Sequence, residues 1–249
     1  MARHIVIPVR LASTRLPRKA LLDIAGKTML EHVYHKALSC HFDSVTIATD
    51  SDEIVKVADG FGASVCMTSS DHQSGTDRIA EAVKQLGFDG KDIIVNIQGD
   101  EPLIPKENVL QAALLLEHNL DAKMSTLCEE ITTEADIFNP NMVKVVFNAA
   151  KEAMYFSRAP IPWQRGIFDQ NKASLGAHYR HIGLYAYRAD FLQNYAQMAK
   201  SPLEQIESLE QLRVLYHGFK IAIDIAQVST PAGIDTLEDL EKVRAFLSE

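Results

Sequence analysis

The feature that most constrains the fold is a regular alternation of short β-branched runs with amphipathic helical patterns in the first half of the chain. Strands are predicted over residues 4–9, 44–49, 64–67 and 92–97. Helices are predicted over residues 28–39, 77–86 and 105–118, and another should begin at a cap supplied by Asp50 or Ser51. This order predicts an α/β fold with a mostly parallel sheet and helices on both faces. Ligands in such sheets bind beyond the carboxyl ends of the strands, so the segments after the strands are the candidates for chemistry.

The second half of the chain is less regular. Strands are predicted over residues 124–130, 143–147, 153–156, 179–187 and 221–225, with a proline-containing polar loop over residues 159–177. A single helix is predicted over residues 203–217, and a last one from Thr236, where Asp239 gives a start like a capping box. No linker forces a division, so residues 1–249 are expected to form one domain.

Composition narrows the class of protein. A net charge of −8 argues against general nucleic-acid binding, yet residues 1–20 carry five Arg or Lys side chains and no acidic one. That cationic segment is either a solvated basic loop or a site for an anion. The three cysteines lie far apart, as in a cytosolic protein with reduced thiols. No stretch approaches the roughly 20 apolar residues of a membrane span, so a soluble cytoplasmic protein is expected, with no membrane partner.

Two familiar nucleotide motifs are absent. The segment Gly26-Lys27-Thr28 lacks the earlier glycine of a P-loop, because Leu21 occupies that position. The pair Gly60 and Gly62 resembles a dinucleotide fingerprint, but Val65 stands where the third glycine belongs. The sequence therefore supports neither a P-loop NTPase nor an NAD enzyme.

Four segments are better candidates for a site. The loop from Arg10 to Lys19 follows the first strand, and its small residues and cations can wrap a triphosphate. Asp100 lies at the carboxyl end of an apolar strand. A carboxylate there can bind Mg²⁺, or it can cap the helix that begins near Pro105. The turn of residues 74–78 opens a helix whose N-terminal amides can hold a base or phosphate. Asp235 precedes the last helix and, taken alone, is most simply a cap.

Together these segments resemble the bacterial 3-deoxy-manno-octulosonate (Kdo) cytidylyltransferases, also called CMP-Kdo synthetases. The resemblance runs nearly end to end and includes residues 138–146, 155–163, 180–188 and 201–213. It implies a Rossmann-like nucleotidyltransferase fold with a smaller inserted dimerisation and sugar-binding region at residues 153–199. Arg18 departs from the family, which more often has glycine there, and it can stiffen the loop or alter its turn.

The resemblance also implies a reaction and a set of residues. The anomeric hydroxyl of Kdo would attack the α-phosphate of CTP and expel pyrophosphate, with Asp100 and Asp235 holding Mg²⁺ as the cofactor and Lys19 and Arg15 as further catalytic residues. The implied nucleotide-binding residues are Arg10, Leu11, Ala12, Ser13, Lys19, Ser74, Gly75, Thr76, Arg78 and Gln98. The implied sugar-binding residues are Gln98, Arg158, Arg165, His181, Tyr185, Glu210 and Gln211.

Alternatives remain at this point. His181 and Tyr185 can instead be satisfied core residues of a strand. The substrate can be another acidic sugar such as a sialic acid, or the chain can be a non-catalytic nucleotide-binding protein on the same fold. The family further implies a homodimer, with residues 153–199 as the expected interface.

Overall fold

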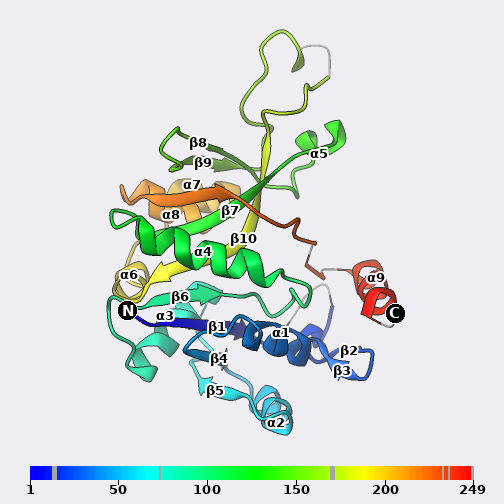
Figure 1. Cartoon of the computed structure of the whole chain (residues 1–249), viewed down its shortest axis with the longest axis vertical. Helices are drawn as coiled ribbons and strands as arrows, with labels where there is room; N and C mark the ends of the chain where they lie inside the picture. The colour runs from blue at the N-terminus through cyan, green and yellow to red at the C-terminus, as the bar shows by residue number, and fades with distance from the viewer. Residues whose placement is uncertain (13–15, 73, 169–171, 232, 235, 248–249) are drawn as a thin grey trace.

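The computed structural model describes residues 1–12, 16–72, 74–168, 172–231, 233–234 and 236–247, and its centre is a nine-stranded sheet (Figure 1). Its strands are β1 (Arg3–Val9), β4 (Ser44–Thr49), β5 (Ser64–Met67), β6 (Ile93–Asn96), β7 (Met124–Glu130), β8 (Lys144–Phe147), β9 (Ala153–Ser157), β10 (Tyr179–Arg188) and β11 (Ile221–Ile225). The main path runs β11-β7-β10-β6-β1-β4-β5, and β8 joins β10 to β9. The strands β6, β1, β4 and β5 are parallel neighbours, as the sequence predicts.

Helices cover both faces of this sheet, which confirms the predicted layers. They are α1 (Met29–Leu38), α2 (Asp52–Gly60), α3 (Gly75–Leu86), α4 (Lys106–His118), α5 (Glu134–Phe138), α6 (Ala189–Tyr195), α7 (Pro202–Glu207), α8 (Gln211–Tyr216) and α9 (Leu237–Leu247). The helices α1, α2 and α4 contribute to the core on one face, and α3, α6 and α8 to the core on the other. In Figure 1 the first face is toward the viewer, with α1 and α4 in front of the strands.

Side-chain caps decide where two of these helices begin. The Ser51 side chain accepts a hydrogen bond from the amide of Ile54, so Ser51 and not Asp50 caps α2. Ser74 caps α3 in the same way, by accepting from the amide of Asp77 at 3.1 Å. The helix expected from Asp77 therefore begins two residues earlier, at Gly75.

Strand β10 runs antiparallel to both of its neighbours, β6 and β7, in a path whose other strands are parallel. Its pairing with β7 shifts between Ile182 and Tyr185, which leaves a bulge. The Thr126 hydroxyl lies 3.0 Å from the Ile182 carbonyl oxygen and 2.8 Å from that of Leu184, so β7 fills the bulge with a polar group. The segment between β9 and β10 extends away from the sheet at the top of Figure 1.

The single helix expected over residues 203–217 is wrong, because the structure has the two short helices α7 and α8. Ser208 lies between them with φ 52°, a left-handed conformation that ends a helix. Ser201 and Glu204 form a capping box at the start of α7. The Glu204 carboxylate also receives the Arg213 guanidinium, at 2.5 and 2.8 Å, and both side chains are buried. This ion pair holds the two helices together across the break.

The C-terminal helix α9 packs beside the sheet against the segment that follows β1. The short 3₁₀ helix η1 (Lys19–Leu21) and the hairpin strands β2 (Asp23–Ile24) and β3 (Lys27–Thr28) follow the first loop. A separate apolar cluster joins Leu16 and Ile24 to Ile234, Leu240 and Val243. Arg244 of α9 donates to the Asp23 carbonyl oxygen at 2.7 and 2.9 Å. None of the described helices has the length and apolar content needed to cross a membrane.

We expect Glu204→Gln to lower the free energy of unfolding by about 3 kcal/mol, because it leaves the buried Arg213 charge without its counterion. Urea denaturation at neutral pH measures this. The control is Glu238→Gln, which removes an exposed pair with Lys242 at 2.7 Å and should leave stability nearly unchanged. A Glu204→Gln variant as stable as the control would contradict the role given to the buried pair.

Candidate functional site

The candidate site lies at the carboxyl edge of the parallel strands, where the loops after β1 and β6 touch. A Cβ atom at Gly99 would lie 2.9 Å from Cγ2 of Val9, the last residue of β1, so only glycine fits there without displacing its neighbour. A Cβ atom at Gly75 would lie 3.4 Å from Cγ of Pro8, which places the start of α3 against the same strand. Three of the four predicted segments therefore converge on the end of β1.

The closest contact between these loops is an ion pair. Lys19 Nζ lies 2.6 Å from Oδ2 of Asp100, with the lysine largely buried and the aspartate side chain 36% exposed. The pair orients the Asp100 carboxylate at the end of the strand and joins the cationic first loop to it. The sequence suggested separate roles for these residues, phosphate binding and metal binding, and the structure places them in contact.

The C-terminal segment reaches the same carboxylate. The amide of Ile234 donates to the Asp100 carbonyl oxygen at 3.0 Å, and a Cβ atom at Gly233 would lie 3.9 Å from Asp100 Oδ1. Three predicted site residues, Ser13, Arg15 and Asp235, lie outside the described residues. Arg10 and Ala12 are exposed after β1, and Leu11 packs on the core.

Two of the predicted nucleotide-binding residues at the start of α3 are buried and bonded to other parts of the protein. Thr76 is buried, and its hydroxyl donates to Oε1 of Glu210 at 3.0 Å. Arg78 is also buried, and it donates to Asp50 Oδ2 at 2.7 Å and Thr68 Oγ1 at 2.6 Å. The guanidinium thus joins the ends of β4 and β5 beneath the turn, a partnership that the sequence did not reveal.

The predicted sugar-binding residues gather in part around β10 and α8. The His181 and Tyr185 rings lie 5.3 Å apart on β10, and Tyr185 pairs across the strands with Asn96. Burial, aided by the Arg180 charge, lowers the pKa of His181 to about 3, so the ring is neutral at physiological pH. Burial and the nearby Glu210 carboxylate raise the pKa of Tyr185, which keeps its hydroxyl protonated.

Two predicted arginines do not join this group. Arg158 donates to the carbonyl oxygens of Glu207 at 2.7 Å and Pro140 at 3.1 Å, so its guanidinium fastens β9 to α7 and a neighbouring loop. Arg165 is exposed on the segment between β9 and β10. The structure brings neither side chain into contact with the other predicted residues that it describes.

Several buried polar side chains lie at or near this edge. Asn96 is fully buried, and within the described residues Glu101 Oε2 and Gln211 Nε2 make no hydrogen bond to other protein atoms. Buried polar groups are usually hydrogen-bonded, so these atoms can bind a ligand. Burial and the adjacent Asp100 charge raise the pKa of Glu101 to about 8. Asn96 and Glu101 were not predicted, although a polar residue inside an apolar strand is a signal that sequence reading can use.

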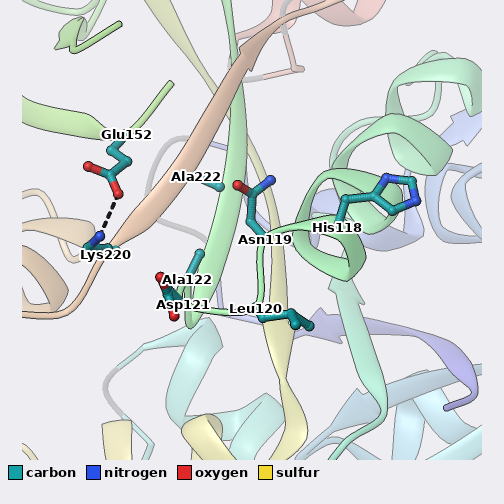
Figure 2. A pocket seen from close by; sticks show the side chains of 8 residues that line it. All are labelled: His118, Asn119, Leu120, Asp121, Ala122, Glu152, Lys220 and Ala222. Atoms are coloured by element: carbon teal, nitrogen blue, oxygen red, sulfur yellow. Dashed lines mark ion pairs between the residues drawn. The ribbon is translucent and has the colours of Figure 1, made fainter. Parts of the chain in front are cut away.

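A different hollow opens at the opposite edge of the sheet, near the starts of β7 and β11 (Figure 2). Glu152 and Lys220, two of the residues that line it, form an ion pair at 2.7 Å. The full lining comprises His118, Asn119, Leu120, Asp121, Ala122, Glu152, Lys220 and Ala222. It shares no residue with the predicted site, so the candidate chemistry stays at the carboxyl edge.

Known proteins resemble the chain over its whole length. The family model described as cytidylyltransferase matches residues 4–221. The chain is 59% identical over 245 residues to the 3-deoxy-manno-octulosonate cytidylyltransferase of Francisella tularensis subsp. novicida, covering 98% of each protein. It is 51% identical over 248 residues to the protein of the same name from Coxiella burnetii, covering 99% of this chain and 100% of that one.

Solved structures agree. A CMP:2-keto-3-deoxy-manno-octonic acid synthetase complexed with CTP matches with a TM-score of 0.90 and 41% identity, covering 100% of this chain and 99% of that one. A cytidylyltransferase from Leptospira borgpetersenii serovar Hardjo-bovis has a TM-score of 0.64 at 20% identity and covers 100% and 87%, which is a likeness of fold alone. With the nucleotidyltransferase fold and these relatives, the chain belongs to the 3-deoxy-manno-octulosonate cytidylyltransferases, within the cytidylyltransferase family.

Proposed function

We propose that the chain transfers CMP from CTP to the anomeric hydroxyl of Kdo, giving CMP-Kdo and pyrophosphate and activating Kdo for lipopolysaccharide biosynthesis. The observation that carries the proposal is the Lys19–Asp100 ion pair at the carboxyl edge. It sits where α/β sheets bind ligands, in a chain 59% identical to a relative named for this activity.

The residues of this edge act by positioning and by charge. Transfer of a phosphoryl-linked group depends chiefly on in-line placement and on neutralising the phosphates. Lys19 and the exposed Arg10 supply positive charge for the triphosphate, with Ser13 and Arg15 of the same loop as further proposed contacts. The start of α3, with Ser74, Gly75 and Thr76, lies against the end of β1 and is proposed to hold the cytidine, with Arg78 in support.

Mg²⁺ fits the donor chemistry of this edge. Magnesium prefers oxygen ligands and is usually held by one or two carboxylates together with substrate phosphates. The half-exposed Asp100 carboxylate is one such ligand, and we propose Asp235, the residue after Ile234, as the second. When bound, the ion would neutralise charge on the phosphates. The ion pair with Lys19 orients the Asp100 carboxylate.

The sugar acid is proposed to bind between β10 and α8. A polyhydroxylated substrate needs hydrogen-bonding groups that are already shielded from water, and Tyr185, Glu210 and Gln211 provide them. His181 is neutral, so its role is to exchange hydrogen bonds and not to carry charge. Gln98, Arg158 and Arg165 complete the proposed set.

Three features of the whole protein belong to the same proposal. Residues 1–249 form one domain, and the region 153–199 takes part in a homodimer, for which the exposed Met154, Trp163 and Leu175 offer apolar surface. A cytoplasmic location is supported by Cys40, Cys66 and Cys128, which are all buried free thiols.

The first test is pyrophosphate release from CTP and Mg²⁺, with Kdo and N-acetylneuraminate supplied in parallel. Release with Kdo alone is expected. Release with the sialic acid alone would keep the reaction and reject the substrate. No release with either sugar, alongside tight CTP binding, would favour a non-catalytic nucleotide-binding protein.

Asp100→Asn should abolish turnover, because the neutral amide cannot replace a carboxylate as a Mg²⁺ ligand. The thermal transition should barely change, since the side chain is 36% exposed and its ion pair is screened by water. The matched control is Asp224→Asn, which breaks the remote Lys151–Asp224 pair of the same 2.6 Å length and should remain active. An Asp100→Asn variant that retains most activity would remove Asp100 from the proposed metal site.

Sedimentation velocity at micromolar concentration tests the assembly. A dimer is expected, because burying the exposed apolar side chains of residues 153–199 removes them from water. A single monomeric species across that range would contradict the proposed homodimer.

A further inference from the structure

The segment that leads from β11 to the candidate site is fastened along its length by side chains from other elements. Gln111 of α4 donates to the Ile225 carbonyl oxygen at 2.8 Å and accepts from the Gln227 amide at 3.0 Å. The next turn of α4 provides Asn108, which is fully buried and donates to the Val228 carbonyl oxygen at 2.7 Å. The segment is therefore a built part of the structure, held against α4.

The last fastening is a charged pair on β7 and β10. Glu129 and Arg180 face each other across these strands, and Glu129 Oε2 accepts from Arg180 Nε at 2.9 Å and Nη2 at 2.6 Å. The same pair holds both backbone groups of Thr230. The Thr230 amide donates to Glu129 Oε1 at 2.5 Å, and its carbonyl oxygen accepts from Arg180 Nη2 at 2.5 Å.

This clamp, defined as Glu129, Arg180 and the Thr230 backbone, fixes the chain just before it reaches the site. Four residues after Thr230, the Ile234 amide donates to the Asp100 carbonyl oxygen. Asp235 is the next residue. Fixing Thr230 lowers the entropy cost of holding Ile234 against Asp100, because each free residue between them adds conformational entropy that must be lost.

We infer that Glu129 and Arg180 are positioning residues for the metal-binding edge, because they fix Thr230 and thereby the segment whose Ile234 amide donates to the Asp100 carbonyl oxygen. The inference rests on the proposed function, in which Asp100 and Asp235 hold Mg²⁺. The clamp acts on this edge through the backbone of the segment. It also ties that segment to β10, the strand that carries His181 and Tyr185.

An alternative is that the pair only strengthens the β7–β10 ladder, as opposite charges across strands commonly do. The geometry distinguishes a positioning role from a purely cross-strand role. To pair with Arg180 across the strands, Glu129 would need only one of its carboxylate oxygens. Here Glu129 uses both oxygens, one for Arg180 and one for the Thr230 amide. Glutamine has nearly the same shape and a single acceptor oxygen, so Glu129→Gln must leave one of these donors unpaired.

The experiment is a titration of the full chain with Mn²⁺ in the presence of CTP and without sugar, followed by the electron paramagnetic resonance signal of free Mn²⁺. Glu129→Gln should raise the Mn²⁺ concentration for half-saturation about tenfold, the scale of losing a group that orients a metal ligand. The matched control is Glu152→Gln, because Glu152 also uses both oxygens, for Lys220 at 2.7 Å and Asn148 at 2.9 Å, at the opposite edge of the sheet. The control should bind Mn²⁺ as the unaltered chain does.

A second pair of variants keeps the test decisive if Glu129→Gln does not fold. Arg180→Lys keeps a charged donor and should retain tighter Mn²⁺ binding than Arg180→Gln. Unaltered Mn²⁺ affinity in folded Glu129→Gln, or equal weakening in Glu152→Gln, would overturn the inference. So would equal affinities of the two Arg180 variants, or no CTP-dependent Mn²⁺ binding by the unaltered chain. Failure to release pyrophosphate with Kdo would instead overturn the proposed function alone.

Discussion

The structure depends on the parallel pairing of β1 with β6. Their register, from Arg3 opposite Ile93 to Val6 opposite Asn96, makes both strands deliver their following loops to one edge of the sheet. Gly99 lets those loops touch, since any side chain there would meet Val9. The Lys19–Asp100 pair is a consequence of that register, because a shift by one residue would turn the strand contacts to the opposite face.

The antiparallel strand β10 gives this edge its second half. In a sheet made only of parallel strands, the loop after each strand lies at the carboxyl edge. The neighbour of β6 would then also contribute only a loop to that edge. Because β10 runs the other way, Tyr179 lies beside Glu130 at the end of β7, and Tyr185 lies beside Asn96 at the end of β6. His181 and Tyr185 therefore come from the body of a strand, where packing fixes them more firmly than a loop would.

The sequence predicts the parallel half of the fold closely, because continuous apolar runs such as residues 92–97 have few alternatives to a buried strand. Local signals fail where the deciding contact is distant. The break at Ser208 accompanies the Glu204–Arg213 pair, and the helical pattern across it looks unbroken without that pair. The resemblance implies that Arg78 binds the nucleotide, whereas in the structure its guanidinium donates to Asp50, 28 residues away. The roles of the site residues stay predictions for the same reason, since the partners that would define them are substrates.

The packing of α9 against the segment after β1 has a consequence for how the candidate site forms. The apolar cluster joins Leu240 and Val243 to Leu16 and Ile24, which lie far away in the sequence. This cluster cannot form until both segments have been synthesised. The contacts that hold the C-terminal segment beside Asp100 are therefore long-range ones, which form late in folding because a long loop must close first.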